Sequence, residues 1–251
     1  MIAQPVGTHL QTPLATLEGI TKSFHRGNVA NTVLHGVNLR VRRGECVFLA
    51  GPSGSGKTTL LSILGGVLSA DEGRVCLFGE DLQRLTEPER LAMRRDRIGF
   101  VFQRFHLIRG LNAVDNVGIP LVLQGVSWPE ARRQAMAMLE SVGMAEHAQA
   151  HPARLSGGQC QRIALARSVV GQPDLVLADE PTAALDAENG RDVMELLRRL
   201  TVQEGKAAVV VTHDPRIFRY ADRIVRLDDG RIVAEDRATE LVAANQAGGE
   251  L

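Results

Sequence analysis

A glycine-rich segment near residue 50 has the residue types and spacing of a phosphate-binding loop. It matches the pattern GxxxxGK[ST] in full and consists of Gly51, Pro52, Ser53, Gly54, Ser55, Gly56, Lys57 and Thr58. Glycines let successive backbone N–H groups turn toward an anion, and a helix that starts here adds its N-terminal dipole. In such loops the lysine reaches the outer phosphates and the hydroxyl coordinates Mg²⁺. The segment therefore predicts a nucleotide site in which Lys57 binds phosphate, Thr58 holds Mg²⁺ and Thr59 adds a hydroxyl.

The flanking residues favour this interpretation over an ordinary glycine-rich turn. Residues 46–50 form a short continuous apolar run, which is typical of a strand buried in a parallel sheet. Residues 59–68 are rich in apolar side chains and suit a helix. Strand, loop and helix in this order are the context that a phosphate-binding loop requires.

Two adjacent carboxylates follow a second buried strand. Four apolar residues, 175–178, lead directly into Asp179 and Glu180. The carboxyl ends of parallel strands form the edge of the sheet where ligands bind. Asp179 is predicted to hold Mg²⁺ through water, and Glu180 to orient and deprotonate an attacking water. An ordinary acidic pair at the start of the next helix is the alternative, and the phosphate-binding loop in the same chain makes it less favoured.

A third motif resembles the signature of a known family. Residues 155–159 read LSGGQ and precede the acidic strand, as in the ABC ATPases. The resemblance extends from about Leu14 to the C-terminal hairpin. It implies an ATPase with Mg²⁺ as cofactor and with an α/β fold. That fold is a P-loop NTPase, RecA-like core that carries an antiparallel β subdomain and an α-helical subdomain.

The resemblance also implies roles for residues that would be unremarkable alone. Gln103 resembles the Q-loop glutamine that touches Mg²⁺ and couples the two lobes. His213 resembles the switch histidine at the γ-phosphate, and residues 183–186 resemble the D-loop at the dimer interface. Phe24 occupies the position of an aromatic ring that stacks on adenine. Without the resemblance, Phe24 would be read as a core residue and His213 as a loop histidine.

The signature motif implies two copies of the chain. In this family the motif contacts the nucleotide held by the opposite subunit, here through Ser156, Gly157, Gly158 and Gln159. A Gly-Gly helix start offers backbone N–H groups and a hydroxyl to the γ-phosphate. The expected assembly is a homodimer that closes on two ATP molecules and opens after hydrolysis. Cys160 and Ala183 depart from the usual family residues, but neither position carries a catalytic group.

Composition limits the possible partners and compartments. Lys plus Arg and Asp plus Glu both number 29, so no basic field predicts a nucleic-acid partner. The three cysteines lack metal-site spacing. No apolar run approaches the ~20 residues of a membrane helix, and the first residues do not resemble a secretion signal. The protein is expected in the cytoplasm, held peripherally at the inner face of the cell membrane by a separate transmembrane permease.

The chain is expected to contain an N-terminal tail (1–13) and one domain (14–251). Within the domain, residues 14–45 are assigned to the β subdomain, 46–106 and 166–251 to the ATP-binding core, and 107–165 to the helical subdomain. Ser127 and Glu130 are expected to form a capping box at the start of a helix, and Asp229-Gly230 a hairpin turn.

Segments 82–103, 111–117 and 177–182 resemble the lipoprotein-releasing, macrolide-export and cell-division branch of ABC ATPases. That branch implies an exporter or a system that transmits motion to an extracytoplasmic domain, with or without a transported substrate. Residues 105–111 and Trp128 are candidates for the groove that receives the permease. The alternative is a non-transport ABC ATPase that acts as a soluble regulator or assembly scaffold, although its usual coiled-coil or zinc modules are not visible.

Overall fold

The large sheet forms the centre of the molecule in the computed structural model, which describes residues 13–27 and 29–237. Its strand order is β10-β9-β3-β8-β7-β6, and all neighbours are parallel except the β9–β10 hairpin. The expected tail at residues 1–13 falls outside the described part except for its last residue. The strands are β3 (Cys46–Ala50), β6 (Ile98–Val101), β7 (Leu175–Asp179), β8 (Ala207–Thr212), β9 (Arg223–Asp228) and β10 (Arg231–Arg237).

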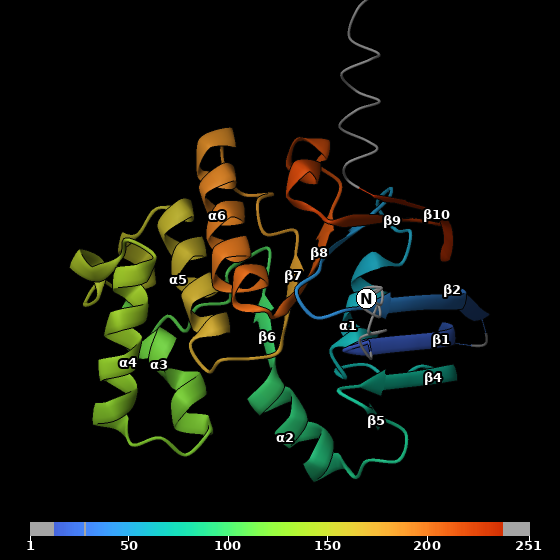
Figure 1. Cartoon of the computed structure of the whole chain (residues 1–251), viewed down its shortest axis with the longest axis horizontal. Helices are drawn as coiled ribbons and strands as arrows, with labels where there is room; N and C mark the ends of the chain where they lie inside the picture. Colours follow the sequence, from blue (N-terminus) through green and yellow to red (C-terminus); the bar gives the residue numbers. More distant parts are fainter. Residues whose placement is uncertain (1–12, 28, 238–251) are drawn as a thin grey trace, which may run out of the picture.

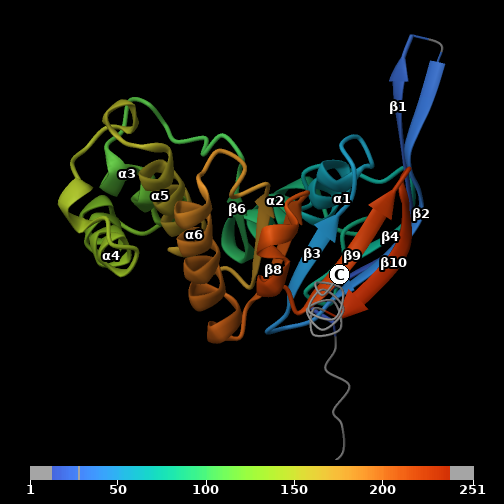
Figure 2. The same ribbon diagram turned by 90° about the horizontal axis from the view of Figure 1, so that it is seen from above.

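A smaller antiparallel sheet packs to one side and has the strand order β2-β1-β4-β5. Its strands are β1 (Ala15–Arg26), β2 (Val29–Val41), β4 (Glu72–Leu77) and β5 (Glu80–Asp81). The sequence placed only residues 14–45 in this subdomain, whereas β4 and β5 come from a segment assigned to the core. The difference arises because β4 returns after the first helix to pair with β1, with Leu17 opposite Val75. In Figure 2 the β1–β2 hairpin projects beyond the rest of the molecule.

The helices occupy both faces of the large sheet and a separate lobe. Figure 1 shows α3 and α4 at the opposite side of the molecule from β1, β2 and β4, with the large sheet between them. The helices are α1 (Lys57–Leu64), α2 (Glu87–Arg97), α3 (Ala113–Leu123), α4 (Trp128–Ser141), α5 (Gly157–Val169) and α6 (Ala187–Leu200). Short 3₁₀ turns are η1 (Ala145–His147), η2 (Pro152–Arg154), η3 (Val202–Glu204) and η4 (Pro215–Tyr220). Within the two described ranges, no helix combines the length and apolar character needed to span a bilayer.

Side chains along the buried strands alternate between the two faces of the sheet, and this divides the core around the sheet into two layers. Leu49 and Val211 face a cluster that includes α1 and the small sheet, whereas Phe48 and Val210 face a cluster with α5, α6 and η4. Every residue of β3 and β8 is buried, because both faces of these strands are covered. A third cluster fills the helical lobe between α3, α4 and α5. The large sheet is therefore held from both sides, and its carboxyl edge is a rigid support for loops.

Two local predictions had different outcomes. Asp229-Gly230 does join β9 and β10, with Asp228 opposite Arg231. Helix α4 does begin directly after Ser127, but the expected capping box is wrong, since the Ser127 side chain makes no capping hydrogen bond. The Glu130 carboxylate instead accepts bonds from Arg133 and Gln134 at 2.6 to 2.8 Å.

Candidate active site

Most of the predicted catalytic and phosphate-binding side chains meet in one cleft of about 870 Å³ at the carboxyl edge of the large sheet. Gln103 follows β6, Asp179 and Glu180 lie at the end of β7, and His213 follows β8. The loop between β3 and α1 lines the cleft with Pro52, Ser53, Gly54, Gly56, Lys57, Thr58 and Thr59. The fold therefore brings together residues as far apart in the chain as Pro52 and His213, which are separated by 161 positions.

At two positions of the phosphate loop there is no room for any side chain. A Cβ on Gly51 would lie 2.0 Å from the Leu227 carbonyl oxygen. A Cβ on Gly56 would lie 2.8 Å from the Leu34 side chain and 2.9 Å from the Val33 carbonyl oxygen, and Gly56 also has a φ of +98°. Cβ atoms essentially never approach other heavy atoms this closely. The two glycines therefore allow the loop to pack against β2 and β9.

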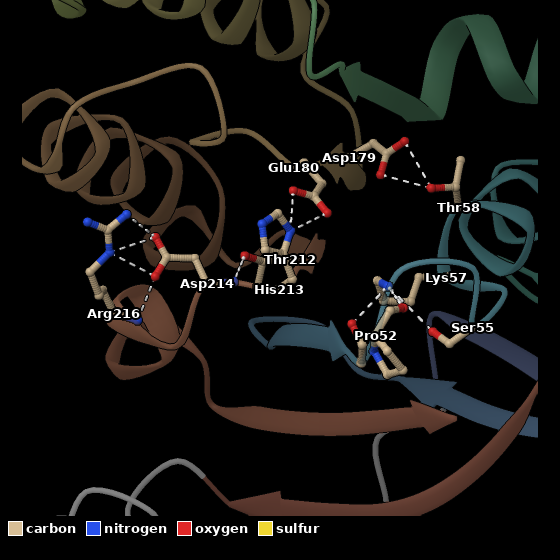
Figure 3. A network of polar contacts seen from close by, with 11 residues as sticks. Pro52, Ser55, Lys57, Thr58, Asp179, Glu180, Thr212, His213, Asp214 and Arg216 are labelled. Carbon is tan, nitrogen blue, oxygen red and sulfur yellow. Dashed lines mark hydrogen bonds and ion pairs between the residues drawn. The ribbon is translucent and has the colours of Figure 1, made fainter. Parts of the chain in front are cut away.

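The Lys57 ammonium lies across its own loop. Its Nζ donates to the carbonyl oxygens of Gly51 at 3.0 Å and Pro52 at 2.6 Å (Figure 3). Burial lowers the pKa of Lys57, while the nearby carboxylates of Glu180 and Asp179 act to raise it. Carbonyl oxygens are neutral partners, so a desolvated ammonium gains more from an anionic phosphate. The loop thus holds a positive charge at the cleft, where a nucleotide phosphate is predicted to bind.

Thr58 and Asp179 together form a candidate Mg²⁺ position. The Thr58 hydroxyl lies 3.2 Å from both carboxylate oxygens of Asp179. Burial raises the pKa of Asp179, as does the charge of Glu180, although Thr58 and Lys57 act in the opposite direction. No group of three His, Cys, Asp or Glu residues that could hold a metal occurs in the described ranges. A hydroxyl and one carboxylate fit Mg²⁺, which takes its other ligands from water and substrate phosphates.

Glu180 and His213 both line the cleft and form a pair (Figure 3). The His213 Nδ1 lies 2.7 Å from the Glu180 carboxylate. Glu180 has a φ of +48°, a strained backbone conformation for a residue with a side chain, and its N–H donates to the Val211 carbonyl at 2.9 Å. Strain of this kind persists where the surroundings over-determine it, often at functional sites. The turn therefore aims the carboxylate away from the strand and toward His213.

Several supporting residues were not identified from sequence. Val33 on β2 lines the cleft, and only its contact with Gly56 in the folded chain reveals this position. After His213, the Asp214 N–H donates to the Thr212 hydroxyl at 3.0 Å, and Arg216 binds the Asp214 carboxylate. These bonds shape the loop that carries His213 (Figure 3).

Phe24 and the signature residues lie outside this cleft. Phe24 is 44% exposed on β1, and the Lys22 ammonium lies 5.7 Å from its ring centroid. Ser156 caps α5 by accepting from the Gln159 N–H at 3.2 Å. The Gln159 side-chain oxygen accepts from the Ser156 N–H at 2.9 Å, and its Nε2 lies 3.0 Å from His147. Within one copy, then, the signature residues complete a capping box and do not line the phosphate cleft.

Comparison with known protein families matches residues 34–183 to a model described as ABC transporter. The chain belongs to the ABC transporter family. The fold and the ATP-hydrolysing activity that the motifs predicted are those of this family's cassettes, and both predictions are confirmed. The individual roles of the site residues and the lobe boundaries remain predictions.

This ABC cassette is similar to macrolide export ATP-binding/permease proteins named MacB. It is 42% identical to that of Sodalis glossinidius over 231 residues, which cover 92% of the chain and 35% of the relative. It is 43% identical to that of Brucella abortus over 223 residues, 89% of the chain and 34% of the relative. The cassette thus spans about a third of the length of the curated relatives it matches, and its resemblance to the macrolide-export branch is confirmed.

Solved ABC cassettes have the same fold. A dimeric cassette, MJ0796, is 40% identical with a TM-score of 0.83, and the match covers 89% of this chain and 98% of that one. One structure of MJ0796 is a dimeric post-hydrolysis state bound to ADP and Pi. CbiO1 from Clostridium perfringens, part of an ABC transporter complex, is 25% identical with a TM-score of 0.83 over 94% of this chain and 92% of its own.

Proposed function

We propose that this cassette is the ATP-hydrolysing subunit of a transporter. In this proposal two copies enclose two ATP molecules and drive a separate transmembrane permease of the exporter or mechanotransmission type. The observation that carries the proposal is that the phosphate cleft gathers Lys57, Asp179, Glu180 and His213 but lacks the signature residues. Within one copy, the cleft and the signature residues lie apart, so the two parts of a complete ATP site would have to come from different copies.

Each residue of the cleft has its own role in phosphoryl transfer. The loop amides and the Lys57 ammonium hold the phosphates, and Glu180 accepts a proton from the attacking water at its carboxylate oxygen. His213 pairs with that carboxylate at 2.7 Å and orients it, and it lines the cleft in which the γ-phosphate would lie. Thr58 and Asp179, with Gln103 lining the same cleft, would hold Mg²⁺, and the ion would supply charge neutralisation at the phosphates. Because this reaction needs mainly positioning and electrostatics, fixed groups on strand ends suit it.

The second half of the site is the start of α5. Ser156, Gly157 and Gly158 present backbone N–H groups and a hydroxyl at the N-terminus of a helix of 13 residues. Such an end attracts the γ-phosphate of a nucleotide held by another copy. ATP then joins the two copies, and loss of the γ-phosphate after hydrolysis weakens the contact. The dimeric state of the similar cassette MJ0796 supports this arrangement.

A second cleft is suited to the permease. It has a volume of about 320 Å³ and is lined by the apolar and aromatic residues Phe100, Phe102 and Ile108, together with His106. The rings of Phe100, Phe102 and His106 stack in series, with centroid separations of 5.7 and 4.7 Å. Of the residues suggested for the permease groove, 105–111 and Trp128, only His106 and Ile108 line this cleft. A cytoplasmic helix of the permease that docks here would hold the cassette at the inner face of the membrane.

The permease interaction can be tested with the membrane protein encoded by a neighbouring reading frame. We expect that protein, reconstituted in liposomes, to bind the cassette and to increase its ATP turnover. Ile108→Asp should abolish the increase, because a carboxylate placed in the groove must be desolvated on docking. Val67→Asp, a matched change at a 64% exposed valine elsewhere, should leave it intact. A cassette recovered in a stable soluble complex, without any membrane protein, would contradict the transporter assignment.

Phe24 provides a test of adenine recognition. Stacking on an aromatic ring is worth roughly 1–3 kcal/mol per base, so Phe24→Ala should weaken ATP binding about 5- to 150-fold. Phe24→Tyr should retain most of the affinity, because it keeps the ring. Titration calorimetry measures both, with Val233→Ala as the control, since Val233 is 62% exposed on β10. Equal affinity of Phe24→Ala and wild type would exclude the ring from base binding.

A further inference from the structure

The loop that follows Gln103 contains two consecutive strained residues. Phe105 has a φ of +60° and His106 a φ of +47°, which side-chain-bearing residues rarely adopt. The loop has few bonds of its own: the Phe105 N–H donates to Phe102 O at 3.0 Å and the His106 N–H to Arg104 O at 2.6 Å. Such a conformation persists only if something outside the loop holds it.

One side chain binds both strained residues. The Arg167 guanidinium, on α5, donates to the Phe105 carbonyl at 2.8 Å and to the His106 carbonyl at 2.7 Å. A planar guanidinium presents its N–H groups as a rigid fork, so it can grip two adjacent carbonyls that a lysine could not bridge equally.

The Arg167 side chain forms its hydrogen bonds with this loop. Burial lowers the pKa of its guanidinium. Within the described part of the chain, those bonds go to the Phe105 and His106 carbonyls. The Arg167 side chain is partly buried, and a partly desolvated charge is stabilised by hydrogen bonds, which the two carbonyls supply. Releasing the loop would cost the guanidinium both bonds, so the positions of the loop and the helix are energetically coupled.

The same loop also touches the other end of α5. A Cβ built on Gly157, at the signature motif, would lie 3.8 Å from the Phe105 ring. The Phe105 ring therefore lies near the first turn of the helix, while the Phe105 carbonyl binds a side chain of the last turn. Arg167 and His106 also both line the groove assigned to the permease.

We propose that Arg167 is a positioning residue that locks the Gln103 loop to the signature helix, so that the two move as one unit. The proposal rests on the proposed function, since its catalytic effect passes through Gln103 at the Mg²⁺ position. A shift of the loop at the groove then displaces the signature motif, and a shift of the motif displaces the loop. Without the two Arg167 hydrogen bonds, the loop is free to move and Gln103 is misplaced, whereas the phosphate loop is unchanged.

The test compares Arg167→Gln, Arg167→Lys and a control, Arg162→Gln. Arg162 is on the same helix but pairs with Asp192 on α6. The first readout is the rate of trypsin cleavage after Arg104, which is exposed and immediately precedes Phe105. Cleavage reports how often the loop opens, and we expect Arg167→Gln to accelerate it about fivefold or more. Arg167→Lys, which keeps the charge but not the fork, should fall between, and Arg162→Gln should match wild type.

The second readout is catalytic. We expect Arg167→Gln to lower kcat about tenfold or more and to raise the Mg²⁺ concentration for half-maximal rate. ATP affinity measured in EDTA should change less than about twofold, since the phosphate loop is untouched. A general loss of stability would instead lower the melting temperature and weaken nucleotide binding with it.

The outcomes separate the two proposals. Unchanged cleavage after Arg104 together with unchanged kcat in Arg167→Gln would overturn the role of Arg167. Faster cleavage with an unaltered Mg²⁺ requirement would support the role of Arg167 and reject that of Gln103. If Arg167→Gln does not fold, Arg167→Lys decides, because a folded lysine variant with wild-type cleavage and kcat also overturns the proposal.

Discussion

Glu180→Gln is expected to bind ATP and lose turnover by about 100-fold to 10,000-fold, the usual contribution of a general base. The amide has the shape of the carboxylate, so the 2.7 Å contact with His213 and the backbone turn can persist. It cannot, however, accept a proton from water. Because hydrolysis no longer releases the γ-phosphate, the ATP-bound dimer should accumulate. Phosphate release measures the turnover, and size-exclusion chromatography with and without ATP measures the dimer.

A matched control separates this effect from the loss of a charge alone. Glu204→Gln removes an exposed carboxylate in η3, away from the phosphate cleft, and should leave turnover and dimerisation as in wild type. Wild-type turnover in Glu180→Gln would remove Glu180 from its assigned role. Loss of turnover together with loss of ATP binding would instead indicate a damaged site.

Lys57→Ala should weaken ATP binding by about 10- to 150-fold, since a hydrogen bond to a charged group contributes roughly 1.5–3 kcal/mol. The change removes the ammonium that the loop holds over Gly51 and Pro52. Turnover should fall further than affinity, because the same charge stabilises the phosphoryl group in the transition state. Calorimetric titration with ATP measures the affinity, and steady-state kinetics measures the turnover.

Lys206→Ala is the appropriate comparison for this variant. The Lys206 ammonium is also partly buried, and its burial lowers its pKa, but it bonds to Gln172 outside the cleft. Its removal should leave ATP affinity unchanged. Unaltered affinity in Lys57→Ala would count against residues 51–58 as the phosphate-binding loop.

Two segments with the sequence pattern of a capping box show how far local patterns can predict structure. Both Ser127–Glu130 and Ser156–Gln159 have a hydroxyl followed three residues later by a side chain that can bond back. Only the second box forms. Glu130 has Arg133 one turn ahead, and their bidentate ion pair at 2.6 and 2.8 Å competes successfully for the carboxylate. Gln159 is neutral and remains with the backbone of Ser156.

The phosphate loop and the acid pair can be predicted from the sequence alone. Their chemistry is encoded in consecutive residues: Lys57 and Thr58 after a buried strand, and Asp179 and Glu180 at the end of another. The strand–loop–helix context needs only local hydrophobic patterns, which depend on the immediate neighbours of each residue. The signature motif identified the family in the same way.

How the phosphate loop, the acid pair and the other site residues meet depends on the tertiary structure. The strand order β3-β8-β7-β6 sets Glu180 beside His213 and Thr58 beside Asp179. The return of β4 to the small sheet and the grip of Arg167 on the Gln103 loop also join segments far apart in the chain. Such contacts depend on which strands pair and which helix crosses which loop. Local periodicity carries no information about these choices, because burial on both faces leaves neighbouring strands alike in sequence.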